Sequence, residues 1–219
     1  MKNTTIVSLI AAVMITAASW AAATDLMTDM PLPAARMEGG KPLLQTLKER
    51  QSARAFSDRA LPAQMLSDLL WAAFGVNRPD SGKRTAPSAR NWQEVEVYAV
   101  LADGTYLYDA GANTLRAVAA GDLRKLTGMQ DFVAAAPLNL VFVADTTKMK
   151  GASSDDLSLY MGADTGFISQ NVYLFCASEG LATVVRGLVD RDALGKAINL
   201  PEHKKIVLCQ TVGYPAAGK

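Results

Sequence analysis

The stretch Asp164–Gly187, with the sequence DTGFISQNVYLFCASEGLATVVRG, decides the fold. Gly180 is a natural left-handed helix stop, and the run Leu181–Arg186 that follows is typical of a strand. The residues before Gly180 place apolar side chains around much of a helix. These side chains are Phe167, Ile168, Val172, Phe175 and Cys176. The stretch therefore predicts a largely buried helix that turns directly into a strand.

Apolar segments elsewhere in the chain predict further strands. Leu138–Ala144 (LNLVFVA) is a continuous apolar run, as expected of a central strand with both faces covered. Glu94–Leu101 alternates apolar and polar residues, and Asp103–Gly104 is a hairpin signal before a second strand at Thr105–Tyr108. Hairpin signals occur beside crossover helices without strict alternation of strand and helix, which predicts an α+β fold.

Helical periodicity predicts several helices around this sheet. The clearest is Leu61–Phe74, where Pro62 suits the first turn and Gly75 suits the end. Asn77–Ala86 is rich in turn-forming and basic residues, and its pattern favours a polar loop. The remaining predicted elements are short helices at Leu43–Leu47 and Asp190–Ile198, helical segments at Leu115–Leu126 and Met129–Ala135, and a strand at Ile206–Val212.

The first residues have the pattern of a targeting signal. Lys2 precedes the apolar run Ile6–Ala18, and Ala21–Ala23 provides the small residues that a signal peptidase requires. The run falls short of the roughly 20 strongly apolar residues that span a bilayer. We therefore expect residues 1–23 to be a cleaved signal peptide, with an uncleaved anchor as the alternative. The mature chain would be exported, to the periplasm, without a stable membrane span, as an N-terminal arm (24–40) and one domain (41–219).

Charge and reactive residues disfavour several classes of function. Without Lys2 the chain has 21 basic and 21 acidic side chains, so no overall field favours nucleic acid or an anionic membrane. His203 is the only histidine and lies in a charged stretch, which disfavours a histidine-based metal site or catalytic triad. Cys176 and Cys209 lie in apolar segments, which favours two buried thiols, although export leaves a disulfide open.

The segment Arg50–Arg54 (RQSAR) is a candidate anion site. In an extended backbone Arg50, Ser52 and Arg54 lie on one side, about 7 Å apart in succession. Guanidinium groups bind phosphate oxygens bidentately and keep their charge when partly desolvated. Taken alone, however, these five residues favour a solvated polar turn between two helices.

Two further segments supply a context for a planar ligand. Ala86–Gln93 (APSARNWQ) combines a rigid turn with small and amide-bearing residues immediately before a strand. Leu181–Gly187 (LATVVRG) ends in a glycine, which lets backbone N–H groups approach a ligand closely. Both segments therefore suit contact with a heteroaromatic ring.

The order of these segments resembles the nitroreductase family. R-x-S-x-R is followed by A-P-S-A-x-N-x-Q before a strand, by Q-N-V-Y-L and G-L-A-T-V-V-R-G, and finally by V-G-Y-P, over roughly Leu43–Pro215. Gly104–Val118 and Asp164–Gly187 are similar to the SagB-type branch, which includes azoline dehydrogenases. The resemblance implies a central, mostly antiparallel sheet flanked by helices. It also implies a homodimer with flavin mononucleotide (FMN) in the interface, and FMN-dependent oxidoreductase activity.

The resemblance further implies which residues contact FMN, and it assigns no catalytic side chain. The residues for the phosphate and the ribityl chain are Arg50, Ser52, Arg54 and the C-terminal Lys219. The residues of a loop that reaches the flavin from the neighbouring subunit are Pro87, Ser88, Asn91 and Gln93. The residues of the strand end whose backbone approaches the flavin N5 edge are Val185, Arg186 and Gly187.

The chain departs from the family pattern at two positions. Glu94 stands where a proline usually follows the glutamine, and Arg90 replaces a common glycine. An arginine beside the ring is compatible with an anionic reduced flavin or an anionic substrate, and equally with a solvated side chain without a role. Three aromatic residues are candidate pocket residues, although each also suits core or interface packing. They are Trp92, Tyr108 and Tyr160.

The expected reaction is hydride transfer between flavin N5 and a small organic substrate, whose identity the residues do not reveal. Export constrains the electron partner, because NAD(P)H is not expected outside the cytoplasm. We therefore expect a redox protein or a quinol-linked partner. Two alternatives stay open. One is a flavin-binding or flavin-processing protein without turnover of an external substrate, and the other is a flavin-free secreted interaction module.

Overall fold

The computed structural model describes residues 27–217, so the expected signal peptide (1–23) and Lys219 lie outside the described residues. A seven-stranded sheet with the order β1-β6-β5-β4-β7-β9-β8 forms its centre, and every neighbouring pair is antiparallel. The strands are β1 (Met30–Pro31), β4 (Val95–Val100), β5 (Gly104–Asp109), β6 (Thr114–Ala120), β7 (Leu138–Asp145), β8 (Ala182–Arg186) and β9 (Lys204–Gly213). The predicted α+β fold is confirmed.

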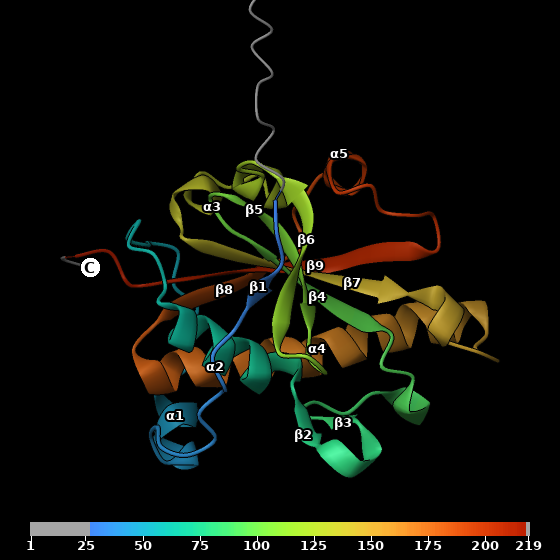
Figure 1. Cartoon of the computed structure of the whole chain (residues 1–219), viewed down its shortest axis with the longest axis horizontal. Helices are drawn as coiled ribbons and strands as arrows, with labels where there is room; N and C mark the ends of the chain where they lie inside the picture. Colours follow the sequence, from blue (N-terminus) through green and yellow to red (C-terminus); the bar gives the residue numbers. More distant parts are fainter. Residues whose placement is uncertain (1–26, 218–219) are drawn as a thin grey trace, which may run out of the picture.

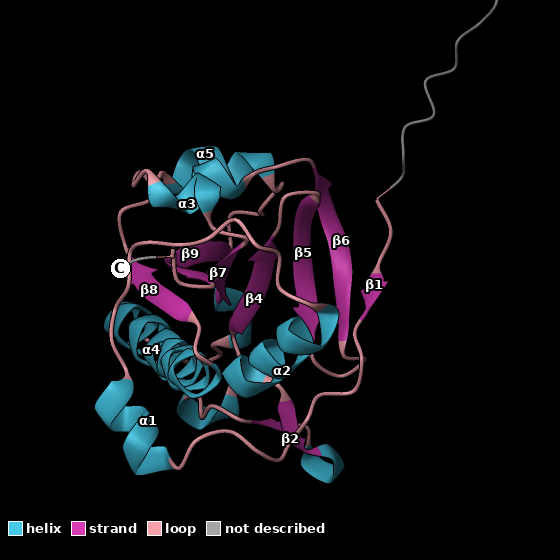
Figure 2. Cartoon of the chain, turned by 90° about the vertical axis from the view of Figure 1, so that its left-hand side faces the viewer, coloured by secondary structure: helices cyan, strands magenta, loops and turns pink. Residues whose placement is uncertain are grey.

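Helices cover both faces of this sheet (Figure 2). On one face lie α2 (Ala63–Phe74) and the long α4 (Ser154–Glu179), and on the other lie α3 (Phe132–Ala135) and α5 (Arg191–Ala197). The short α1 (Leu43–Glu49) lies near the C-terminal end of α4 (Figure 1). Within residues 27–217 no helix is long and apolar enough to cross a membrane.

The central strand β7 separates two hydrophobic cores. All of its residues are buried between β4 and β9. Successive side chains of a strand point to opposite faces, so Leu140 and Phe142 pack under α2 and α4 while Val141 and Val143 pack under α5. Burying a side chain such as Phe142 completely stabilises a fold by about 1.5–3 kcal/mol, which explains why the apolar run was a sound signal for this strand.

Helix α4 begins at a capping box and ends at a left-handed glycine. Ser153 Oγ accepts a hydrogen bond from Asp156 N–H, and the Asp156 carboxylate accepts one from Ser153 N–H. Gly180 has a φ of 72°, as predicted for the helix stop. The helix starts at Ser154 rather than at Asp164, because its first turns project beyond the core and so carry no continuous apolar pattern.

The prediction of a helix at Leu115–Leu126 is wrong, because this segment contains β6, which pairs with β5, followed by a 3₁₀ turn, η3 (Arg124–Thr127). Its alanines favour a helix intrinsically. However, Asp109 Oδ1 accepts hydrogen bonds from the N–H groups of Gly111 and Ala112 and thereby stabilises a tight turn. The turn folds the chain back onto β5, and strand pairing overrides the helix propensity.

Two other predicted segments also differ from the structure. Asn77–Ala86 is not an irregular loop, because most of it forms a two-stranded hairpin of β2 (Val76–Arg78) and β3 (Lys83–Arg84). Of the helical segment predicted at Met129–Ala135, only the short α3 is helical. Strands of two or three residues are too short to show a period of two in the sequence.

The two cysteines are free thiols on opposite faces of the sheet. Cys176 belongs to the core under α4 and Cys209 to the core under α5, so the prediction of two buried thiols is confirmed. Burial raises the pKa of the Cys209 thiol to about 11, which makes this group unreactive at neutral pH. His203 is exposed in a turn, and the described residues contain no cluster of metal-ligating side chains.

Candidate functional site

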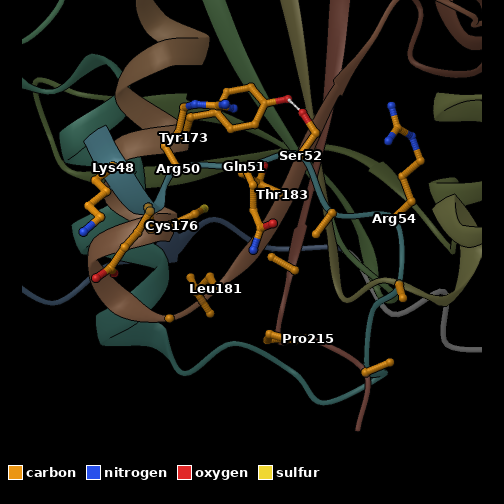
Figure 3. A pocket seen from close by; sticks show the side chains of 17 residues that line it. Lys48, Arg50, Gln51, Ser52, Arg54, Tyr173, Cys176, Leu181, Thr183 and Pro215 are labelled. Carbon is orange, nitrogen blue, oxygen red and sulfur yellow. Dashed lines mark hydrogen bonds between the residues drawn. The ribbon is translucent and has the colours of Figure 1, made fainter. Parts of the chain in front are cut away.

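A cavity of about 800 Å³ opens between the segment that follows α1, the C-terminal end of α4 and the start of β8 (Figure 3). The segment Arg50–Arg54 is extended, and Ala53 N–H donates a 2.9 Å hydrogen bond to Thr183 C=O on β8. Further along, Phe56 forms an isolated β-bridge with Pro215. The chain after α1 therefore follows the edge of the sheet and forms one wall of the cavity.

Arg50, Ser52 and Arg54 project to one side of this segment, whereas Gln51 projects to the other (Figure 3). All of them line the cavity. The Arg50 guanidinium lies 5.3 Å from the centroid of the Tyr173 ring, in a cation–π contact. Neither Arg50 nor Arg54 forms a salt bridge with any described residue. Two guanidinium groups at this cavity are therefore available to an anion.

Tyr173 on α4 ties this segment to β8. Its hydroxyl accepts a 2.9 Å hydrogen bond from Val185 N–H and lies 2.8 Å from Ser52 Oγ. One side chain thus fixes both the hydroxyl of Ser52 and the end of the strand. Tyr173 is not among the site residues predicted from the sequence, although a polar tip on the apolar circumference of a buried helix is a signal that marks such a residue.

Replacing Tyr173 by phenylalanine is expected to lower the free energy of unfolding by about 1–3 kcal/mol, because Val185 N–H loses its partner in a partly buried place. Tyr160→Phe is the matched control, since the Tyr160 hydroxyl has no hydrogen-bond partner among the residues that the structure describes. Urea denaturation followed by circular dichroism measures both changes. Equal losses in the two variants would contradict the bridging role of Tyr173.

Only the start of β8 lines the cavity, and the predicted residues Val185, Arg186 and Gly187 are not among its lining residues. The side chain of Arg186 points away from the cavity. It is buried on the opposite face of the sheet and donates hydrogen bonds to Thr211 Oγ1 (3.0 Å), Thr127 C=O (2.7 Å) and Asn139 Oδ1 (2.9 Å). Burial lowers the pKa of this guanidinium. The resemblance assigned the backbone of Val185, Arg186 and Gly187 to the flavin, and that assignment stays a prediction.

The predicted loop residues do not reach this cavity within one chain. Ala89 N–H donates a 2.9 Å hydrogen bond to Asp164 Oδ2 on α4, whereas Ser52 contacts Tyr173 farther along the same helix. At a rise of 1.5 Å per residue, these two positions on α4 are about 14 Å apart. A single chain therefore holds the two halves of the predicted site at different places on α4.

The loop itself has an unusual backbone. Arg90, Asn91 and Gln93 have φ values of 50°, 55° and 47°, a region that residues other than glycine rarely adopt. The loop is closed by Ser88 Oγ, which accepts a 3.0 Å hydrogen bond from Gln93 N–H, and by Gln93 Oε1, which accepts a 2.9 Å bond from Arg84 Nε. Pro87 and Asn91 are exposed. Backbone strain of this kind clusters at functional sites.

The candidate aromatic residues are divided between the surface and the core. The indole of Trp92 lies edge-on to the ring of Tyr160, with 5.8 Å between centroids, and the Arg90 guanidinium lies 5.3 Å from the indole centroid. Arg90 is exposed in this position. Tyr108 is buried in the core beneath α2 and does not line the cavity at Arg50.

Fold and site together define an α+β protein with a cation-lined cavity suited to a phosphate-bearing ligand. Residues 47–214 match the model of the nitroreductase family. The chain therefore belongs to the nitroreductase family, whose members are generally FMN-dependent oxidoreductases.

Related proteins agree with this assignment. A candidate nitroreductase of Methanocaldococcus jannaschii is 27% identical over 176 residues, which cover 76% of this chain and 88% of the relative. The crystal structure of a candidate nitroreductase from Ralstonia eutropha JMP134 has 42% identity and a TM-score of 0.83, covering 87% of this chain and 91% of that one. A chain of the E. coli microcin synthetase complex with truncated pro-MccB17 bound has 18% identity and a TM-score of 0.66, covering 95% and 85% of the two chains, and shares the fold.

Proposed function

We propose that this protein is an FMN-dependent oxidoreductase that transfers hydride between flavin N5 and a small organic substrate. The observation that carries the proposal is the pair Arg50 and Arg54, which lines one cavity and has no salt-bridge partner among the described residues. Paired guanidinium forks match the geometry of phosphate oxygens. The hydroxyl of Ser52 between them fits a ribityl or phosphate oxygen, so the residues present fit FMN.

The chain's own residues bind and orient the cofactor, and FMN when bound supplies hydride transfer at N5. Arg50 and Arg54 hold the phosphate, while Tyr173 keeps Ser52 in place. Val185 N–H already donates to Tyr173. Thr183 C=O and Val185 N–H point away from β9, so Arg186 N–H, which pairs with β9, points inward. A hydrogen bond to the N5 edge would therefore fall to Gly187 N–H.

A homodimer would complete the site. A two-fold axis that crosses α4 midway between Asp164 and Tyr173 would bring the loop of one copy, anchored at Asp164, near Tyr173 and the cavity of the other copy. Apolar side chains on α1 and α4 support such an interface, since Leu44 is 80% exposed and Phe167 is 47% exposed. Gly166, which like Phe167 is exposed on α4, has open space around it, which lets a second helix approach closely.

Location and electron partner are proposed from the sequence. The apolar run Ile6–Ala18 and the small residues Ala21–Ala23 support export to the periplasm through a cleaved signal peptide. A redox protein or a quinol-linked partner then exchanges electrons with the enzyme in place of NAD(P)H. The similarity of Gly104–Val118 and Asp164–Gly187 to SagB-type oxidoreductases supports a place near that branch.

The mature protein is expected to bind FMN with one molecule per protomer, to show the visible absorption of a flavin, and to sediment as a dimer. Micromolar NADH is expected to bleach this flavin only slowly. Absorption spectra before and after addition of FMN, followed by sedimentation, measure these properties. A colourless protein that does not bind added FMN would favour the flavin-free module, and bound FMN without substrate-dependent redox cycling would favour a flavin-binding protein.

A further inference from the structure

Two buried carboxyl groups lie beneath the loop Pro87–Gln93. Glu94, the next residue along the chain, is 0% exposed, and Asp164 on α4 is 1% exposed. Both carboxyl oxygens of Glu94 lack a hydrogen-bond partner within the part of the chain that the structure describes, as does the nearby Thr165 Oγ1. Buried polar groups almost always have partners, and two neighbouring carboxylates in a buried place repel each other. The pair therefore requires a proton.

The proton belongs on Glu94. Burial, the largest cause, raises the pKa of the Glu94 carboxyl to about 7, and the negative charge of Asp164 acts in the same direction, as does the hydrogen bond that a proton on Glu94 allows with Asp164. A backbone hydrogen bond and the ammonium group of Lys148, in the 3₁₀ turn η4 (Thr146–Lys148), act in the opposite direction. Protonated Glu94 has an O–H group that can donate to Asp164, whereas ionised Glu94 only accepts.

Asp164 is also the residue that fastens the loop to α4. Its Oδ2 accepts the hydrogen bond from Ala89 N–H, at 2.9 Å. A second hydrogen bond, 3.3 Å from Lys148 Nζ to Gln93 C=O, ties the end of the loop to the turn η4. A loop with three non-glycine residues at positive φ is unfavourable by itself and needs such anchors.

We propose that Glu94 is a positioning residue, which shares a proton with Asp164 and thereby keeps the loop Pro87–Gln93 in the geometry that contacts FMN. This inference rests on the proposed function. When Glu94 releases its proton to solvent, two negative charges face each other, Asp164 is drawn away from Ala89 N–H, and the loop loosens.

The test compares FMN affinity at pH 6 and pH 8 in the wild-type protein and in Glu94→Gln, by quenching of FMN fluorescence. The glutamine keeps an N–H donor for Asp164 and cannot ionise in this range. For a loop that requires the proton, the wild-type affinity falls about tenfold relative to the variant between these pH values. Titration of the FMN phosphate itself is common to both proteins and cancels in the ratio. An unchanged ratio would overturn the proposal.

Infrared difference spectra of wild type minus Glu94→Gln provide a second measurement. The wild-type protein is expected to show the C=O stretch of a protonated carboxylic acid at pH 6, and this band is expected to disappear as the pH rises through about 7. In Asp164→Asn the band should disappear at a lower pH, because the negative charge of Asp164 no longer raises the pKa of the Glu94 carboxyl. Absence of the band at pH 6 contradicts the shared proton. Failure of the wild type to bind FMN at either pH contradicts the proposed function instead.

Discussion

The variant Arg186→Met is expected to lose about 3–4 kcal/mol of unfolding free energy, the largest effect that we expect from one side chain. The Arg186 guanidinium belongs to a residue only 5% exposed and donates to three oxygens. Methionine fills a similar volume but leaves Thr127 C=O without this donor and weakens the network around Asn139 and Thr211. Removing a complete buried ion pair can be neutral, whereas removing only the donor leaves acceptors that are desolvated and unpaired.

The geometry offers an internal control for this prediction. A Cβ added at Gly128 would lie 1.9 Å from Arg186 Nη1, so Gly128→Ala must displace the guanidinium. Gly128→Ala should therefore destabilise the wild-type protein strongly and the Arg186→Met variant much less. The exposed Arg116, which pairs with Asp109 at the surface, serves as the matched comparison, because Arg116→Met is expected to cost at most about 1 kcal/mol.

Urea denaturation of the four proteins in the Gly128 and Arg186 cycle measures the free energies and their coupling. Additive losses would show that Gly128 and Arg186 act independently and would contradict the role given to the guanidinium. A loss of less than about 1 kcal/mol of unfolding free energy in Arg186→Met would contradict the prediction that the buried hydrogen bonds of Arg186 stabilise the fold.

Elements with a strong local pattern could be predicted from the sequence. The apolar run of β7, the stripe of α2 and the glycine after α4 each depend on neighbouring residues only, and all three are confirmed. The prediction for β6 was wrong because its alanines favour a helix locally, while its strand conformation depends on pairing with β5. The hairpin of β2 and β3 was not predicted because its strands are too short to show the two-residue alternation of a strand.

The candidate site divides in the same way. An extended segment places Arg50, Ser52 and Arg54 on one side by geometry alone, so the sequence could predict their common orientation. The polar tip of Tyr173 on a buried helix marks it as a candidate, but its partners Ser52 and Val185 could not be predicted because they are brought to it by the fold. The same holds for the pairing of Glu94 with Asp164, which are distant in the sequence. Arg186 was predicted beside the flavin through its backbone, and its side chain instead forms buried hydrogen bonds on the other face of the sheet.

Removing both charges of the cavity, in Arg50→Ala/Arg54→Ala, is expected to weaken FMN binding at least about a hundredfold. Each hydrogen bond to a charged group contributes about 1.5–3 kcal/mol, and 1.4 kcal/mol corresponds to a factor of ten. Lys83→Ala/Lys125→Ala is the matched control, because it removes two positive charges from exposed positions outside the cavity. This control should bind FMN almost as the wild type does.

Riboflavin, which has the same ring without the phosphate, separates the two parts of the ligand. Isothermal titration of both flavins into the wild type and into the arginine double variant gives four affinities. If Arg50 and Arg54 hold the phosphate, the wild type prefers FMN over riboflavin strongly, the double variant loses this preference, and riboflavin affinity is nearly the same in the two proteins. A double variant that retains the full preference for FMN would place the phosphate elsewhere and contradict the site. A loss of equal size for FMN and riboflavin would instead assign the two guanidinium groups to the ring, because only an interaction with the shared part of the ligands affects both alike.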